Sequence, residues 1–506
     1  MTKNYLDILA ETIRNNWDQP ALTDFYLTED GKVQDTSRGN HYTYGEMYEK
    51  IVQVADLLIR LGLQKGDHIA ICGANSSHWV IAYLAIAKVQ GVSVTIMHSL
   101  QPAEIAHLVD FSDAKVLFAD RELWNEYKEQ SLLKVVSVIS LGDWSVLRGK
   151  SIQISNLQTP ISNSEIGFAQ VDPNSLTMIC FTSGSTGNPK GVMIPYRSIN
   201  ANVDYQFKEY SNVLINRSII VSLPMAHTYS SMNECIKPLC FGMNVNIVTI
   251  PIFIQQFLSY SHLINPAYID LVPQMLQKII TSTQAKSILQ KKDLISVFVG
   301  GAKIPKDIEK IIPQLGVPVT TGYGISECGP IISATLPDKY RIGSVGLVLP
   351  TLEVTISNCG EILVKGENVM LGYYKDPEAT AQKIDADGWL HTGDKGHLDE
   401  DGYLYVEGRL EQDIIVLPNG ENIRPDNVEA LINALPEVKE SIVLARDGKL
   451  VAIVVSDQQL VVSLRREILR AVNPQLPLFS QLYDVEITDQ PLARTEKQTL
   501  KRYLYK

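Results

Sequence analysis

The stretch Phe181-Thr-Ser-Gly-Ser-Thr-Gly-Asn-Pro-Lys-Gly191 directly follows an apolar run, Leu176 to Phe181, that is typical of a buried strand. Its glycines permit positive φ angles and close approach of the backbone to a ligand. A flexible linker is a poor alternative, because linkers do not ordinarily join a buried strand to another apolar segment. The side chains that could donate hydrogen bonds or positive charge to phosphate oxygens are Thr182, Ser183, Ser185, Thr186 and Lys190. The stretch therefore predicts a phosphate-binding loop after a buried strand.

Around this loop, short apolar runs alternate with stretches of helical periodicity. A run at Ile69 to Cys72 precedes a helix-like stretch, Trp79 to Val89, and further runs follow at Val92 to Ile96 and Val116 to Phe118. A second series of this kind extends from Ile219 to Tyr323. Such alternation is typical of α/β folds with mostly parallel strands. We therefore predict a large N-terminal domain of layered α/β subdomains.

The sequence pattern changes twice in the last third of the chain, first to β-type segments and then to a mixture of strands and a helix. Glycine-bearing β-type segments between Val345 and Val364 predict a small β subdomain. After Gly408-Arg409, apolar runs at Ile442 to Leu444 and Val451 to Val455 and a helix near Val462 to Val472 predict a separate α+β domain. This tail of roughly 100 residues is long enough to fold as one. The predicted domains are residues 1–408 and 409–506.

Composition and charge disfavour several classes of function. The chain has 506 residues, of which 45% are hydrophobic and 20% charged, as expected of a folded globular protein. The 45 Lys and Arg residues against 56 Asp and Glu give a net charge of -11, so the molecule as a whole repels nucleic acid. An anionic ligand must then be held by local cations and oriented backbone N–H groups.

We find no sign of export or membrane insertion in the sequence. Six cysteines are scattered without metal-binding spacing, and we identify no signal peptide, which favours a reducing cytoplasm. The most apolar region, Ile219 to Phe257, is interrupted by Pro224, Glu234 and Lys237, so we expect no transmembrane helix. Residues 1–16 have the spacing of an amphipathic helix, which we expect to lie on the surface.

The stretch 181–191 resembles the phosphate loop of the adenylate-forming superfamily, which includes acyl-CoA synthetases, luciferases and the adenylation domains of peptide synthetases. It differs from the usual P-loop, since Pro189 precedes the lysine and Gly191 follows it. The resemblance extends over most of the chain. Tyr323-Gly-Ile-Ser-Glu327 is similar to an element whose glutamate helps to hold Mg²⁺ and whose aromatic ring stacks on adenine. Val299-Gly300-Gly301-Ala302 resembles a wall of the adenine pocket.

Two further motifs resemble the ribose-binding elements of this superfamily. The resemblance implies that Asp394 of His391-Thr-Gly-Asp394 accepts hydrogen bonds from the ribose and that Arg409 of Gly408-Arg409 contacts ribose or phosphate. Singly, they could be a turn aspartate and a surface arginine, and their order along the chain favours binding. The implied ATP-binding residues are Thr182, Ser183, Gly184, Ser185, Thr186, Gly187, Lys190, Gly301, Ala302, Tyr323, Gly324, Ser326, Glu327, Asp394, Arg409 and Lys497, with Thr182 and Glu327 as metal ligands.

The tail carries the elements that the resemblance connects with a change of conformation. Glu411 stands at the position of the hinge residue, commonly Asp or Lys, about which a mobile C-terminal domain turns between two half-reactions. Residues 418–423 resemble the loop that enters the active site for thioester formation. Pro491-Leu-Ala-Arg-Thr-Glu-Lys497 is similar to the element that provides the adenylation lysine, although Glu496 stands where Gly is usual. Lys497 could otherwise be one of several basic residues of the tail, such as Lys501.

The acid-binding side is indicated by Pro224-Met-Ala-His227, which resembles the element of acyl- and aryl-activating members that borders the carboxylate. Amino-acid-activating relatives carry an Asp nearby, and none occurs from 222 to 233, so we expect an aliphatic or other acyl acid. The predicted pocket residues are Tyr196, His227 and Gly300. Tyr196 replaces a common His and either lines the acid or packs, and His227 could instead satisfy a backbone group.

Together these features predict a two-step reaction. The carboxylate reacts with MgATP to form an acyl-adenylate, and the acyl group then passes to the thiol of CoA. The predicted catalytic residues are Lys190, His227, Glu327 and Lys497. A separate acyl carrier protein with a phosphopantetheine thiol is the alternative acceptor, and aryl and amino acids are less favoured substrates. A nucleotide-binding regulatory protein without turnover is the alternative of another class, suggested by the departures at Tyr196 and Glu496.

Overall fold

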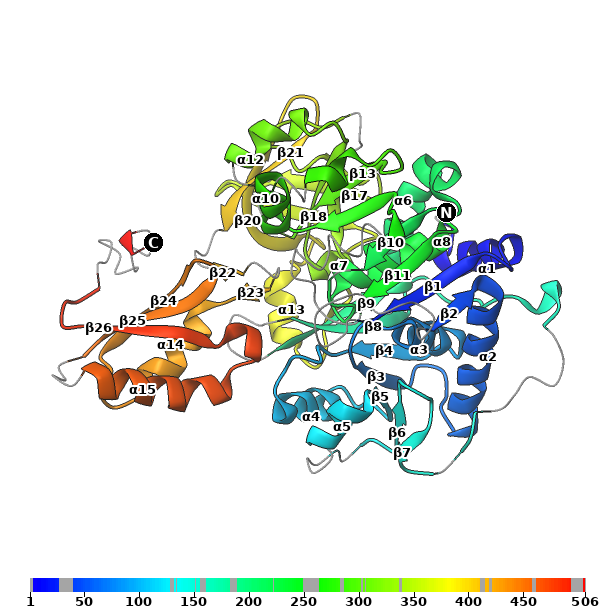
Figure 1. Cartoon of the computed structure of the whole chain (residues 1–506), viewed down its shortest axis with the longest axis horizontal. Helices are drawn as coiled ribbons and strands as arrows, with labels where there is room; N and C mark the ends of the chain where they lie inside the picture. Colours follow the sequence, from blue (N-terminus) through cyan, green and yellow to red (C-terminus); the bar gives the residue numbers. More distant parts are fainter. Residues whose placement is uncertain are drawn as a thin grey trace. The chain divides into compact units, whose positions relative to one another are not determined.

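A computed structural model of the chain (Figure 1) describes residues 3–26, 40–127, 132, 134–150, 152–154, 161–182, 189–221, 223–248, 264–282, 286–301, 304, 306–335, 339–409, 415–417, 421–456, 461–492 and 504–505. The chain divides into two compact units. The first comprises Met1–His98, Ala106–Phe181 and Gly191–Leu410, and the second comprises Ser99–Ile105, Thr182–Lys190 and Glu411–Lys506.

An eight-stranded sheet has the order β19-β9-β8-β4-β3-β5-β6-β7. Its inner strands β8, β4, β3, β5 and β6 pair in parallel, as the alternation of apolar runs and helices predicts. The strands are β3 (His68–Cys72), β4 (Val92–Thr95), β5 (Val116–Ala119), β6 (Ser137–Ser140), β7 (Val146–Arg148), β8 (Leu176–Thr182), β9 (Lys190–Pro195) and β19 (Gly372–Tyr373).

A nine-stranded sheet has the order β16-β15-β14-β13-β12-β10-β11-β1-β2. Strands β14, β13, β12, β10, β11 and β1 pair in parallel, and the strands at both edges are antiparallel. The strands are β1 (Pro20–Phe25), β2 (His41–Thr43), β10 (Ser218–Val221), β11 (Asn244–Val248), β12 (Tyr268–Leu271), β13 (Ser296–Val299), β14 (Val319–Gly324), β15 (Ile331–Ala334) and β16 (Leu347–Val348).

Helices of the first unit cover and separate these sheets. Helix α3 contacts β3 and β4 of one sheet and β1 of the other, which is why it is buried all round from Ser77 to Ala87. The longer helices are α1 (Tyr5–Asn15), α2 (Tyr44–Arg60), α3 (Ser77–Lys88), α4 (Pro102–Phe111), α5 (Arg121–Tyr127), α6 (Tyr196–Leu214), α10 (Pro273–Thr281), α12 (Lys306–Ile311) and α13 (Pro377–Lys383).

The N-terminal helix α1 is amphipathic, as the sequence predicts. Tyr5, Leu9 and Ile13 have no exposed surface, whereas Glu11 and Arg14 on the other face are exposed. The prediction of a surface helix is therefore confirmed, because its apolar stripe packs on the core and its charged face stays in solvent.

A small antiparallel sheet follows the nine-stranded sheet and confirms the predicted β subdomain. Its order is β17-β18-β20-β21, with β17 (Leu352–Ile356), β18 (Glu361–Gly366), β20 (Leu390–Leu398) and β21 (Leu404–Arg409). Within this sheet Asp394 of β20 pairs with Arg409 of β21. The two predicted ribose-binding motifs are therefore neighbours along one ladder.

The second unit has its own α+β core. Antiparallel β24 (Glu440–Arg446) and β25 (Lys449–Val455) pair with parallel β26 (Leu482–Thr488), and Figure 1 shows α14 (Pro425–Asn433) and α15 (Val461–Val472) on one face of this sheet. Val428, Ile432, Leu464 and Ile468 of these helices are buried in the core. A short hairpin, β22 (Ile415–Val416) and β23 (Asn422–Ile423), precedes the helices. The predicted fold class is therefore confirmed.

No helix among the described residues is both long enough and apolar enough to cross a bilayer.

Candidate active site

Two predicted elements emerge at the same edge of the nine-stranded sheet. Strands β13 and β14 are parallel neighbours, with Val299 paired to Thr321. Gly300 and Gly301 directly follow β13, and Tyr323 and Gly324 end β14. The carboxyl ends of adjacent parallel strands are a common place for ligand sites in open α/β sheets. The structure therefore brings the predicted adenine wall next to the predicted adenine-stacking tyrosine.

Close contacts or backbone angles constrain three glycines at this edge. A Cβ on Gly300 would lie 3.0 Å from ring carbons of both Phe298 and Tyr229. A Cβ on Gly324 would lie 1.8 Å from the carbonyl oxygen of Pro330, and Gly301 has a φ of +80°. The fold itself therefore requires glycine at 301 and 324, whereas a larger residue at 300 would need the two rings to shift.

Glu327 is held by a residue that the sequence did not single out. It lies in the short helix η6 (Ser326–Cys328) and is half-buried. The hydroxyl of Tyr373 in β19 donates to Oε1 of Glu327 at 2.6 Å, and the backbone N–H of Met370 donates to the Glu327 carbonyl oxygen at 2.9 Å. This pairing fixes the direction of the carboxylate. It joins residues 46 positions apart, so local sequence patterns do not reveal it.

Asp394 is joined directly to Tyr323. The tyrosine hydroxyl donates to Oδ2 of Asp394 at 2.6 Å, and the Asp394 side chain is almost completely buried. Burial and the charge of Asp394 raise the pKa of Tyr323 well above the ordinary tyrosine value, so the hydroxyl keeps its proton at neutral pH. The predicted adenine-stacking and ribose-binding residues thus form one hydrogen-bonded pair.

The turn that carries Asp394 is held by Glu361 of β18, which the sequence also did not single out. Oε1 of Glu361 accepts from the backbone N–H of Gly393 at 2.8 Å, and Oε2 lies 2.9 Å from Nδ1 of His391. The Thr392 hydroxyl accepts from the N–H of Asp394 at 3.0 Å and donates to the carbonyl oxygen of Ile362 at 2.8 Å. Every residue of the His-Thr-Gly-Asp motif is therefore anchored.

The predicted acid-binding element meets the nucleotide elements. The Thr228 and Ser326 hydroxyl oxygens lie 3.3 Å apart, and the Cys180 thiol of β8 donates to the carbonyl oxygen of Ala226 at 3.5 Å. The Tyr229 ring lies 5.9 Å from the Phe298 ring and against Gly300. The segment 226–229 therefore touches the ends of three strands, β8, β13 and β14.

His227 begins the short helix α7 (Thr228–Ser230). Its Nδ1 accepts from the backbone N–H of Tyr229 at 3.2 Å, so the neutral ring carries its proton on Nε2. The His227 side chain is exposed. Both observations fit a neutral imidazole that a substrate can approach. The alternative role for His227, satisfying a backbone group, is also fulfilled.

Buried charges lie behind Tyr229. Asp270 of β12 has no exposed surface, and its Oδ1 accepts from the Tyr229 hydroxyl at 3.3 Å. Glu234 and Lys237 are also buried, and they lie in and directly after the π-helix η3 (Ser231–Ile236). Burial raises the pKa of Asp270 and lowers that of Lys237, while attraction between the two charges opposes both shifts.

The buried acids weaken one argument from the sequence. Residues 222–233 contain no Asp, but Glu234 directly follows them and Asp270 reaches Tyr229 from another strand. Among the described residues, Oδ2 of Asp270 and Nδ2 of Asn233 have no hydrogen-bond partner. The absence of an acid from one short segment therefore does not exclude a substrate that carries a donor or a positive charge.

The placement of Tyr196 contradicts its predicted role in the acid pocket. Strand β9 returns to the amino-terminal end of β8, where the N–H of Tyr196 donates to the Ser175 carbonyl oxygen at 3.1 Å. Cys180, which contacts the 226–229 segment, is four residues along β8 from Leu176, or about 13 Å. Tyr196 therefore belongs to the opposite edge of the sheet.

The remaining predicted residues are placed only in part. Thr182 ends β8 and Lys190 begins β9, and both belong to the second unit. Those that lie outside the described residues are Ser183, Gly184, Ser185, Thr186, Gly187, Ala302, Glu411 and Lys497, together with the side chain of Arg409.

The chain matches two family models. Residues 9–374 match the AMP-binding enzyme family, and residues 412–505 match the C-terminal domain of AMP-binding enzymes. Similar curated proteins include a probable CoA ligase of Humulus lupulus, 27% identical over 83% of this chain and 79% of that protein. They also include 4-coumarate–CoA ligase 3 of Oryza sativa subsp. japonica, 28% identical over 81% of this chain and 76% of that protein.

Solved structures share the fold over almost the whole chain. o-Succinylbenzoate CoA synthetase from Bacillus subtilis superimposes with a TM-score of 0.76 at 23% identity, over 99% of this chain and 98% of that one. Mycobacterium tuberculosis fatty acyl CoA synthetase superimposes with a TM-score of 0.66 at 22% identity, over 99% and 97% of the two chains. Because one family model matches well over half of its residues and a second matches its tail, this chain belongs to the AMP-binding enzyme family.

Proposed function

We propose that this protein is an acid–CoA ligase that works through an acyl-adenylate. In the first step a carboxylate oxygen attacks the α-phosphorus of ATP, forming acyl-AMP and releasing pyrophosphate. In the second step the CoA thiol attacks the acyl carbonyl, loses its proton, and displaces AMP. The observation that carries this proposal is the convergence of the Thr228, Gly300 and Tyr323 segments at one sheet edge, with Tyr323 joined to Asp394. The match to the AMP-binding enzyme family supports it.

Within this proposal, the nucleotide is bound on the side of β13 and β14. Tyr323 and Gly301 would contact adenine, and Asp394 with Arg409 would contact the ribose. The loop of residues 182–190, with Lys190, would hold the phosphates. His227 would border the acyl carboxylate, where a neutral imidazole adds no charge to repel or trap the substrate.

The residues present also fit a magnesium ion. Mg²⁺ takes oxygen ligands, and Glu327 provides a half-buried carboxylate whose direction is held by Tyr373. In this proposal Thr182 and phosphate oxygens would complete the ligand set. When bound, the ion would offset negative charge on those oxygens.

We further propose that residues 409–506 form a mobile domain that turns about Glu411. In this scheme Lys497 stabilises negative charge on the phosphate during adenylation and withdraws before the thiol attacks. Lys497→Ala should then abolish most acid-dependent pyrophosphate release, while CoA attack on supplied acyl-adenylate stays largely intact. Lys501→Ala is the matched control from the same basic tail. Equal loss in both half-reactions would contradict this role.

The acid itself is proposed to be an aliphatic or other acyl acid whose chain lies along the Tyr229 and Phe298 rings. A second candidate is an acid that carries a hydroxyl or amino group at its far end. It is favoured by one specific observation, the buried Asp270 carboxylate behind Tyr229, whose Oδ2 has no partner among the described residues. The buried Lys237 charge offsets part of the Asp270 charge, and a donor on the acid would complete the hydrogen bonding of Oδ2.

Matched substrates separate these candidates. Pyrophosphate release with ATP and Mg²⁺ would be measured with hexanoate, 6-hydroxyhexanoate, 6-aminohexanoate and 4-coumarate. Preference for hexanoate supports the aliphatic acid, and preference for a donor-bearing acid that is lost in Asp270→Asn supports the second candidate. If no acid of a broad panel releases pyrophosphate, the proposed function is wrong and a nucleotide-binding regulator takes its place.

The thiol acceptor has a test of its own. With the preferred acid, thioester formation would be compared between CoA and a panel of carrier proteins bearing phosphopantetheine. CoA is proposed because proteins similar to this chain are named CoA ligases. Product formation with carriers and not with CoA would contradict this choice and leave the adenylation step standing.

A further inference from the structure

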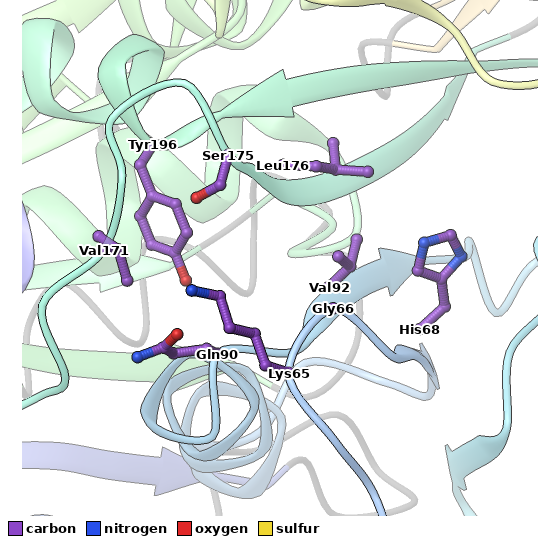
Figure 2. A pocket seen from close by; sticks show the side chains of 9 residues that line it. All are labelled: Lys65, Gly66, His68, Gln90, Val92, Val171, Ser175, Leu176 and Tyr196. Carbon is purple, nitrogen blue, oxygen red and sulfur yellow. The ribbon is translucent and has the colours of Figure 1, made fainter.

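A cavity of about 180 Å³ lies at the amino-terminal ends of β3, β4 and β8 (Figure 2). His68 and Val92 begin two of these strands, and Leu176 begins the third. The candidate active site gathers at their opposite, carboxyl-terminal side, where Cys180 contacts the 226–229 segment. The reaction proposed above makes no use of this cavity.

One wall of the cavity carries a buried polar group that lacks a partner. Tyr196 is only 2% exposed, and its hydroxyl makes no hydrogen bond of ordinary geometry with a described residue, although the Thr177 side chain lies near it. The Tyr196 ring is held by stacking on Tyr5, with ring centroids 6.2 Å apart. Figure 2 shows the hydroxyl directed into the space between the lining residues. A buried hydroxyl without a partner is unusual and indicates that a ligand or solvent completes its hydrogen bonding.

The facing wall supplies a positive charge. Lys65 lines the cavity, forms no ion pair with a described residue, and in Figure 2 extends its ammonium group toward the same space as the Tyr196 hydroxyl. No acidic side chain lines the cavity. The amide group of Gln90 is held at the rim, where its Nε2 donates to the Gln170 carbonyl oxygen at 3.3 Å. Because the protein carries a net charge of -11, a local cation of this kind marks where an anion can be accepted.

Three apolar side chains also line the cavity, together with His68 and Ser175, whose side chains are hydrogen-bonded to backbone carbonyl oxygens. Val92, Val171 and Leu176 contribute hydrocarbon surface next to the two donors. Inorganic phosphate would leave this surface without a partner, whereas a short hydrocarbon body would cover it. A small organic carboxylate combines both properties, since its carboxylate accepts from Lys65 and Tyr196 and its chain lies on the valines and the leucine.

We propose that this cavity is a second binding site, for a small monocarboxylate, at the edge of the eight-stranded sheet opposite the active site. Lys65 and Tyr196 hold the carboxylate, and Val92, Val171 and Leu176 contact the hydrocarbon body. The site is independent of the proposed reaction, because it uses none of the residues assigned to ATP or to the acid that is activated.

Calorimetry on the full chain without ATP tests this site with butyrate, its neutral isostere butyramide and inorganic phosphate. Butyrate should bind, and Lys65→Gln and Tyr196→Phe should each weaken this binding about tenfold, as expected for loss of one charge-assisted hydrogen bond. Lys292→Gln removes an exposed lysine elsewhere, and Tyr340→Phe removes another buried hydroxyl without a described partner, packed against a different core cluster, so both should leave butyrate binding unchanged.

Several outcomes would overturn the proposal. They are butyrate binding that is absent, butyrate binding equal to that of butyramide or phosphate, and butyrate binding unaffected by both cavity variants. If Tyr196→Phe alters the melting temperature and leaves butyrate binding unchanged, the hydroxyl has only a structural role and the proposal is wrong. Pyrophosphate release assayed on the same samples reports the proposed reaction separately, so failure of either idea can be told from failure of the other.

Discussion

The nucleotide side and the acid side of the candidate active site differ in how their polar groups are satisfied. On the nucleotide side, Glu327 is held by Tyr373 and Asp394 is held by Tyr323. On the acid side, Asp270 and Asn233 are buried and each has a side-chain atom without a partner in the described part of the chain. A fully paired site is prepared for one ligand that never changes, whereas unpaired buried groups must be completed by the substrate. The proposal of a donor-bearing acid therefore places selectivity among acids behind Tyr229.

The largest effect is expected from the glycines, which differ between the two sides. In Gly324→Ala on the nucleotide side, the new Cβ would overlap the Pro330 backbone oxygen at 1.8 Å, so the free energy of unfolding should fall by about 3 kcal/mol or more. In Gly300→Ala on the acid side, the new Cβ would contact only the Tyr229 and Phe298 side chains. Because these can shift, the free energy of unfolding should fall by less. Urea unfolding measures both, with Gly167→Ala as the control in open space. Equal decreases in the free energy of unfolding for Gly324→Ala and Gly300→Ala would contradict this difference between the two sides.

The next effect concerns the paired carboxylate of the nucleotide side. Asp394→Asn keeps the shape but removes the charge that accepts from Tyr323, and should lower kcat/KM for ATP in pyrophosphate release about thirtyfold, or about 2 kcal/mol. The KM for the acid should change little. Asp387→Asn, an exposed residue of the same small sheet region, is the control. If Asp394→Asn changed only the KM for the acid, Asp394 would act on the acid side and the prediction would be wrong.

A pH dependence is expected from the acid side. Because burial raises the pKa of Asp270 above that of the unfolded chain, the folded protein holds this proton more tightly. This contribution to stability is present at pH values below the ordinary carboxyl pKa and is lost as the pH rises toward the raised value. Asp270→Asn should abolish that part of the pH dependence, measured by urea unfolding at several pH values. If the pH dependence of the free energy of unfolding is the same in the variant, the prediction is wrong and the Asp270 charge is already compensated in the folded protein.

The smallest effect is expected from Tyr229→Phe. The hydrogen bond to Asp270 is long, at 3.3 Å, so its loss should change the free energy of unfolding by less than about 1 kcal/mol. The variant leaves Asp270 with one donor fewer, and should shift the ratio of kcat/KM between 6-aminohexanoate and hexanoate toward the donor-bearing acid. Tyr374→Phe, whose hydroxyl donates to Asp113 instead, serves as the control. If this ratio stays unchanged, Asp270 has no part in selecting the acid.

Much of the fold was predictable because it depends on local patterns. The apolar run Leu176 to Phe181 forms most of β8. The helical stretch Trp79 to Val89 corresponds to α3, which ends one residue earlier, at Lys88. The residues of Tyr323-Gly-Ile-Ser-Glu327 and His391-Thr-Gly-Asp394 could be selected from their order along the chain, and the structure brings the two motifs into contact through Tyr323 and Asp394. The roles of Lys190, Glu411 and Lys497 remain predictions.

The alternation of strands and helices, the glycine-bearing turns and the family were all readable from local patterns, because periodicity and motif spacing are properties of consecutive residues. Tertiary structure alone decided that Tyr373 holds Glu327, that Asp270 stands behind Tyr229, and that Tyr196 lies at the far edge of the sheet. These pairings join residues on strands and turns far apart in the chain. They depend on the order in which strands assemble into sheets and on which buried polar groups can reach one another, and no local pattern contains that information.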